Sequence, residues 1–240
     1  MKWRSCLLTL AAAALLGSGA AASDLGEAAK VLPPVFTLRE LPGREYLYFQ
    51  GRRYPYEAAQ LTADMRREGI FLSAYLFSGT IPDDEKALAA PYFQYNLGPA
   101  ELAGLAALNA AFFNKDAALH KALEDMVSRW ADQMAGGTEG ARLVVALDEM
   151  EPVRRAGDAS AILYTAGTRV TLSSEGLILP LYGRAYLYRD GGDYRVLMLI
   201  TSDDSRQPMM YALEDIAVEA ADTAARRDLA AYVQALRAKG

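Results

Sequence analysis

The stretch from residue 142 to residue 201 constrains the fold most strongly, because short β-forming runs follow one another there with only turn residues between them. Val, Ile, Leu and Tyr dominate the runs 143–147, 160–165, 168–172, 177–182, 185–188 and 194–200. Strands this close leave no room for crossover helices, so the sheet they form should be antiparallel. Gly167 and Gly183 are interpreted as breaks between strands, and 188–194, with its Gly191-Gly192 pair, is the clearest hairpin.

Two long segments carry the apolar spacing of amphipathic helices. The first, 99–135, begins at a proline and ends before Gly136-Gly137, and the second, 208–238, has a break at Thr223. A shorter helix is predicted over 57–68, and strands are predicted over 35–38, 46–50, 70–77 and 92–95. The predicted fold class is therefore α+β, with an antiparallel sheet packed by long amphipathic helices.

The first 22 residues have the three parts of an export signal. Lys2 and Arg4 precede an apolar run over 7–16, and small residues follow it up to Ala22, so cleavage is expected between Ala22 and Ser23. The run is about half as long as the roughly 20 residues that a membrane span needs. We therefore expect an exported chain, periplasmic or secreted, with no stable membrane span after cleavage.

The remaining chain divides into a flexible lead-in over 23–32 and a single α+β domain over 33–240. Residues 44–54 and 184–194 share Arg, Tyr, Leu, Tyr, Gly and Tyr in register, which leaves open two sheet-plus-helix halves, 33–137 and 141–240. Convergence is the favoured alternative, because Tyr suits strands and Gly suits turns.

Residues 45–51, Glu-Tyr-Leu-Tyr-Phe-Gln-Gly, resemble the cleavage site of a viral protease used to remove purification tags. A complete export signal precedes them and ordinary sequence follows them, so we interpret them as part of the native chain. Their aromatic residues predict a strand.

The composition excludes several kinds of partner and site. Removing Lys2 and Arg4 with the signal moves the formal net charge from −5 to −7, which disfavours nucleic acid. The only Cys, Cys6, lies within the signal, so the processed chain is expected to be free of disulfides. With one His in addition, the usual zinc and copper sites cannot be built, and no metal or cofactor is expected.

Tyrosine is the one enriched residue type that can bind ligands, with 14 in the chain. Strand alternation places Tyr46 and Tyr48 on one face, and likewise Tyr186 and Tyr188. Exposed faces of this kind would bind a sugar or peptide, and these four residues are the candidate binding site. The favoured alternative is that they pack against a helix, with the ring buried and the hydroxyl hydrated.

Paired carboxylates are the one catalytic chemistry left open. Asp148, Glu149, Asp203 and Asp204 lie in or beside predicted loops, where they could hydrolyse glycosides or be solvated charges. We therefore predict an envelope domain that binds an unidentified protein, peptide or sugar without catalysis. The alternatives are a carboxylate-dependent hydrolase, and a structural envelope component held through exposed Met209 and Leu213 of the last helix.

Overall fold

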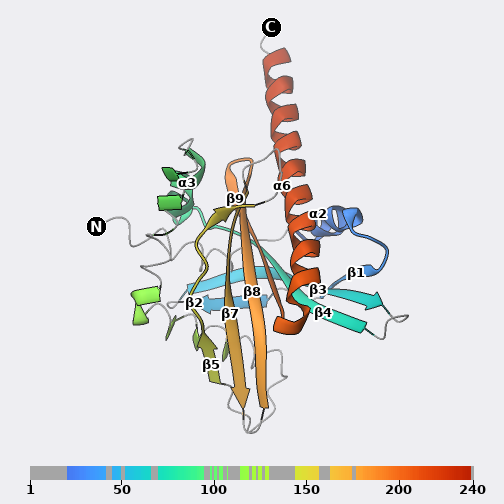
Figure 1. The fold of residues 1–240 in the computed structure, drawn as a ribbon. Coiled ribbons are helices and arrows are strands. Elements are labelled where there is room, and N and C mark those ends of the chain that lie inside the picture. The colour runs from blue at the N-terminus through green and yellow to red at the C-terminus, as the bar shows by residue number, and fades with distance from the viewer. Residues whose placement is uncertain are drawn as a thin grey trace.

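The computed structural model describes most of the chain outside the first 20 residues (Figure 1). The described residues are 21–41, 45–49, 52–65, 70–94, 144–156, 163–174 and 177–238, with isolated positions between 98 and 129. Within these ranges the fold is an antiparallel sheet with one long helix across it, which confirms the α+β prediction in its coarser form.

The sheet contains strands from both ends of the chain. They are β1 (Phe36–Glu40), β2 (Glu45–Phe49), β3 (Arg52–Met65), β4 (Ile70–Thr80), β5 (Val144–Leu147), β6 (Arg154–Arg155), β7 (Leu163–Ser174), β8 (Leu177–Asp190) and β9 (Asp193–Ser202). The order is β1-β3-β4-β9-β8-β7-β5, with β2 paired to β3 and β6 paired to β7, all antiparallel. β3 and β4 run across the view in Figure 1 and β7 and β8 run along it, so the sheet is strongly twisted.

The predicted hairpin at 188–194 is confirmed. Asp190, the last residue of β8, pairs with Asp193, the first residue of β9, which leaves Gly191 and Gly192 as a two-residue turn. Gly191 has φ +62°, a backbone conformation that costs glycine little and other residues more. Gly167 and Gly183, predicted as breaks, instead lie inside β7 and β8, so four predicted short strands are two long ones.

The main core lies between the sheet and α6 (Arg206–Arg237), which follows the short 3₁₀ helix η3 (Asp203–Ser205). The buried face of α6 is mostly alanine, and small side chains let a helix approach a sheet closely. Its buried residues are Met209, Ala212, Leu213, Ile216, Ala217, Ala220, Ala221 and Ala224. The last turns of α6 extend past the sheet in Figure 1, and Leu229, Tyr232 and Leu236 are exposed there.

The helix predicted over 57–68 is wrong, because its described part belongs to β3. Ala59, Leu61 and Ala63 are all buried and alternate with more exposed neighbours, which is the period of a strand rather than a helix. β3 pairs with β1 on one side and with β4 on the other. Tertiary pairing therefore overrides the helix-like spacing of Ala58, Leu61 and Met65.

Three other helix and strand predictions need correction. The strand predicted over 92–95 is wrong, because its described residues, 92–94, lie in the helix α3 (Lys86–Gln94). The break at Thr223 is wrong, because α6 continues through it and the Thr223 hydroxyl bonds Glu219 within the helix. Most of 99–135 lies outside the described residues. α6 is therefore the one long helix described, and the prediction of two long helices is not confirmed.

The segment predicted as a flexible lead-in, 23–32, lies mostly in α2 (Ala21–Ala28) and the 3₁₀ helix η1 (Ala29–Val31). Leu25 and Ala28 are buried in the same core cluster as α6, and Figure 1 shows α2 beside that helix. This short helix therefore contributes apolar side chains to the core.

The two similar segments form hairpins with different registers. Phe49 aligns with Arg189 in the sequence, but Phe49 pairs with Arg52 whereas Arg189 pairs with Tyr194. Residues that align in the two sequences therefore have partners at different spacings in the two strand pairs.

Candidate functional site

One face of β8 carries both the predicted tyrosines and the residues that build the site. Four alternating residues of this strand are buried: Tyr182, Arg184, Tyr186 and Tyr188. Tyr186 is 0% exposed and Tyr188 is 6% exposed, and both belong to the core cluster beneath α6. They therefore pack in the core and present no open aromatic surface. Tyr46 and Tyr48 lie in β2, whose side chains fall outside the described residues.

A connecting segment between β5 and β6 brings Glu151 over this face. Both strands pair with β7 at the edge of the sheet, and the Glu151 amide donates to the Gly167 carbonyl at 2.8 Å between them. The Thr168 hydroxyl donates to the Asp148 carbonyl at 2.9 Å. Met150 and Val153 are buried on either side of Glu151, so the segment is anchored by both its backbone and its apolar side chains.

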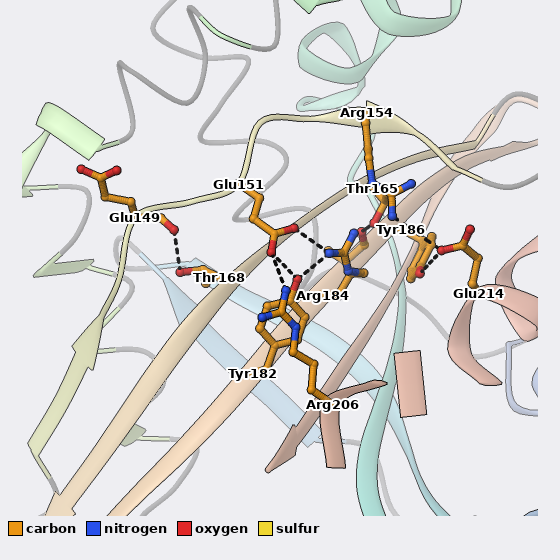
Figure 2. A network of polar contacts seen from close by, with 11 residues as sticks. Glu149, Glu151, Arg154, Thr165, Thr168, Tyr182, Arg184, Tyr186, Arg206 and Glu214 are labelled. Atoms are coloured by element: carbon orange, nitrogen blue, oxygen red, sulfur yellow. Dashed lines mark hydrogen bonds and ion pairs between the residues drawn. The ribbon is translucent and has the colours of Figure 1, made fainter. Parts of the chain in front are cut away.

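Glu151 accepts hydrogen bonds from three side chains, which with it form the Glu151 cluster (Figure 2). The Tyr182 hydroxyl donates to Oε1 at 2.7 Å, Arg184 Nη2 donates to Oε2 at 2.6 Å, and Arg206 Nη2 donates to Oε1 at 3.0 Å. The Arg206 guanidinium also lies 3.8 Å from the centre of the Tyr182 ring, within the range of a cation–π contact. The carboxylate is therefore held by two cations and a phenol.

The cluster depends on a glycine in the neighbouring strand. Gly167 of β7 pairs with Arg184 of β8, and a Cβ built at Gly167 would lie 2.2 Å from the Tyr182 hydroxyl and 2.8 Å from its Cζ. Only a residue without a side chain leaves space for the Tyr182 ring. The glycine predicted to break a strand thus lets Tyr182 reach Glu151.

Burial and neighbouring charges shift the pKa values of the cluster. Burial raises the pKa of Tyr182 above its ordinary value, and its hydrogen bond to Glu151 raises it further. Burial by itself lowers the pKa of Arg184, but Tyr182 and Glu151 more than offset this and the net shift is upward. The phenol therefore stays neutral and the guanidinium stays charged at physiological pH.

A second set of polar contacts joins β8 to α6. The Tyr186 hydroxyl donates to Glu214 Oε2 at 3.0 Å, and Arg154 Nη2 lies 3.7 Å from the same oxygen. Burial raises the pKa of Tyr186, and the Glu214 carboxylate raises it further. Glu214 thus has a phenol on its sheet side and a cation from β6.

Two adjacent clefts open around the Glu151 cluster, and Arg169 and Arg206 line both of them. The edge cleft is lined on its polar side by Asp148, Glu149, Glu151, Thr168, Arg169, Tyr182 and Arg206. The α6 cleft is lined by four arginines and three carboxylates, namely Arg154, Arg169, Arg184, Arg206, Asp203, Asp204 and Glu214. Each cleft has a volume of about 500 Å³, in the range of small-molecule sites.

The four acids suspected of catalysis are divided between these clefts. Asp148 and Glu149 line the edge cleft, whereas Asp203 and Asp204 line the α6 cleft. Figure 2 shows the Glu149 side chain pointing away from Glu151. The structure therefore brings the four suspected acids to one region of the sheet, two to each cleft.

Sequence reasoning missed Arg184 and Arg206, which contribute most of the contacts to Glu151. A signal for Arg184 was present, because it alternates with tyrosines at 182, 186 and 188 on one strand face. A charged residue in the middle of a buried face needs a partner. No comparable signal marks Arg206, which lies at the start of α6 and reaches Glu151 only through the fold.

No protein-family model matches the chain, and no curated protein matches its sequence. Among the described residues, no group of three or more His, Cys, Asp or Glu side chains is placed to hold a metal ion. None of the described helices combines the length and the apolar character that crossing a membrane requires.

Proposed function

We propose that this chain is an exported, non-catalytic binding domain of the cell envelope, and that it holds a small polar ligand in the two clefts around the Glu151 cluster. The observation that carries the proposal is the fixed set of guanidinium groups lining these clefts. Arg206 is held by Glu151 and Tyr182 and keeps about a third of its side chain exposed. A charged group that is already oriented loses little freedom when a ligand binds.

The hydrolase alternative finds less support in this geometry. A glycosidase needs two carboxylates separated by roughly 5 to 10 Å across one site, whereas the two suspected acids of each cleft, Asp148 with Glu149 and Asp203 with Asp204, are adjacent residues of one segment. Glu151, the carboxylate of the Glu151 cluster, already accepts hydrogen bonds from two arginines and a tyrosine. Both oxygens of this carboxylate are therefore already occupied by donors of the protein itself.

The structural-component alternative loses the residues on which it was based. Met209 and Leu213 lie on the buried face of α6 and are both 0% exposed, so neither is available to another protein. The exposed large apolar residues of α6 are instead Tyr211 near its start and Leu229, Tyr232, Val233 and Leu236 further along.

Calorimetric titration of the processed chain with panels of short peptides and oligosaccharides tests the proposal. We expect saturable heat with at least one panel, its loss in Arg206→Ala, and its retention in Arg237→Ala, an exposed arginine at the far end of α6. Circular dichroism would check that both variants fold. If neither the peptides nor the oligosaccharides bind, the proposal is contradicted.

Assays of nitrophenol release from aryl glycosides give the opposing outcome. Turnover by the wild-type protein that disappears in Glu149→Gln or Asp203→Asn would establish the hydrolase instead. Export is checked separately, by determining whether the protein recovered from the cell envelope begins at Ser23.

A further inference from the structure

The Arg184 guanidinium is buried in the wall of the α6 cleft with one of its nitrogens unused. The side chain is 9% exposed. Its Nη2 donates to Glu151 Oε2 and to the Tyr182 hydroxyl, at 2.6 and 2.5 Å. Among the described residues, Nη1 is buried and has no hydrogen-bond acceptor. Buried charged donors are almost always paired, so this nitrogen is a donor without its acceptor.

The same cleft holds an acceptor that receives no hydrogen bond. Asp203 Oδ1 is buried and has no hydrogen-bond donor in the described part of the chain. Arg169 Nε lies 3.5 Å away as an ion pair. Asp203 and Arg184 both line the α6 cleft. One cleft therefore contains an unused donor on a cation and an unused acceptor on an anion.

Three other charged side chains of the α6 cleft, Arg154, Arg206 and Glu214, are already engaged. Glu214 has Tyr186 and Arg154 beside it, and Arg206 is bound to Glu151. Figure 2 shows Arg184 between Glu151 and Tyr186. The unused pair is thus set within a framework of fixed charges, which is the arrangement expected of a preformed site.

We propose that the α6 cleft binds a small zwitterion, with its carboxylate at Arg184 Nη1 and its ammonium group at Asp203. α-Amino acids and the ends of short peptides have this chemistry. Arginine is well suited to carboxylate recognition because its donors lie in one rigid plane. Met210 and Tyr211 also line the cleft and offer apolar surface to the rest of the ligand. This proposal rests on the proposed function and names the ligand class.

Titration with altered ligands tests the proposal without changing the protein. The probes are L-alanine, L-glutamate and trialanine, each compared with its C-terminal amide and its N-acetyl form. We expect binding of at least one unmodified probe and at least tenfold weaker binding of both modified forms. Equal binding of the amide would show that no carboxylate is needed at Arg184 and would overturn the proposal.

Two variants then locate the site. Asp203→Asn keeps the shape of the side chain and removes its charge, so it should weaken the unmodified probe more than the N-acetyl form. Arg184→Lys keeps the charge but loses the planar donors, and it should weaken the unmodified probe more than the amide. Arg237→Gln, at the exposed end of α6, is the control and should change neither.

The outcomes separate this proposal from the one on which it rests. Binding of oligosaccharides or inorganic phosphate, without binding of any amino acid or peptide, would overturn the zwitterion and leave a binding domain. Absence of binding by every probe would remove both. If a zwitterion binds and its affinity is the same in Asp203→Asn and Arg184→Lys, the α6 cleft is not its binding site and the proposal is overturned.

Discussion

The two ends of one face of β8 have opposite characters although they lie on the same strand. At one end, Tyr186 and Tyr188 are covered by α6 and belong to the apolar core. At the other end, Tyr182 and Arg184 are covered by Glu151 and by Arg206. The first end is closed by a helix, and the second borders two clefts.

The position of the covering element decides whether a buried strand face becomes apolar core or a charged site. α6 begins at Arg206, and its first buried apolar residue is Met209. Apolar packing therefore stops one helical turn from the start of α6, and charged side chains fill the space beyond. Groups held this way stabilise little by themselves, because desolvation offsets their attraction, but they leave charges fixed beside a cleft.

The apolar end is tested by shortening a side chain of α6. Leu213 is 0% exposed, so Leu213→Ala should lower the free energy of unfolding by about 2–5 kcal/mol, through lost burial and the cavity left behind. Leu236→Ala is the matched control on the same helix, because Leu236 is 53% exposed, and its effect should stay within about 0.5 kcal/mol. Urea denaturation followed by circular dichroism measures both.

Equal effects of the two substitutions on the free energy of unfolding would contradict the closure of the apolar end by α6. A large loss in Leu236→Ala would mean that the distal part of α6 is covered in solution. A small loss in Leu213→Ala would mean that α6 does not close the apolar end of the face.

The polar end is tested through a pair of mid-strand glycines. Gly167→Ala places a methyl group 2.2 Å from the Tyr182 hydroxyl, so the ring must move and the contacts to Glu151 must change. We expect a loss of about 1–3 kcal/mol in the free energy of unfolding, the usual cost of overpacking. Gly183→Ala is the control, because its nearest atoms are two carbonyl oxygens at 3.9 Å.

Crystal structures and unfolding curves of the two alanine variants give the measurement. Tyr182 should leave its position beside Arg206 in Gly167→Ala and keep it in Gly183→Ala. A Tyr182 ring that stays in place in both variants would show that the Glu151 cluster does not depend on the glycine.

Local patterns in the sequence were enough to predict much of this fold. The closely spaced runs after residue 142 predicted antiparallel strands, and the Gly191-Gly192 pair predicted the turn between β8 and β9. The apolar spacing from Met209 onward predicted α6 and its buried face. In each case a regular period or a turn residue acts within a few positions of the chain.

Contacts between distant segments account for what the sequence did not predict. Residues 57–65 fit a helical spacing at three positions and a strand alternation at Ala59, Leu61 and Ala63, and only pairing with β1 and β4 decides between them. The Glu151 cluster joins residues from a connecting segment, β8 and α6. No local period links Glu151 to Arg206, which is 55 positions away.

The boundary between the two ends of the face is tested at Tyr186. Its ring lies in the apolar core, and its hydroxyl donates to Glu214 at 3.0 Å. Tyr186→Phe removes this hydrogen bond, so near neutral pH we expect a loss of about 0.5–1.5 kcal/mol in the free energy of unfolding. Tyr232→Phe, on the exposed part of α6, is the control.

The pH dependence of this loss distinguishes a buried phenol from a merely bonded one. Burial and Glu214 raise the pKa of Tyr186 in the folded protein, whereas the unfolded chain releases that proton at about pH 10. Above that pH the unfolded state binds fewer protons, so the wild-type protein loses about 1.4 kcal/mol per pH unit through this one group. Tyr186→Phe lacks this loss, and its disadvantage should shrink and then reverse. Urea unfolding from about pH 8 to about pH 11 measures the difference, and parallel curves would mean that Tyr186 ionises as easily folded as unfolded.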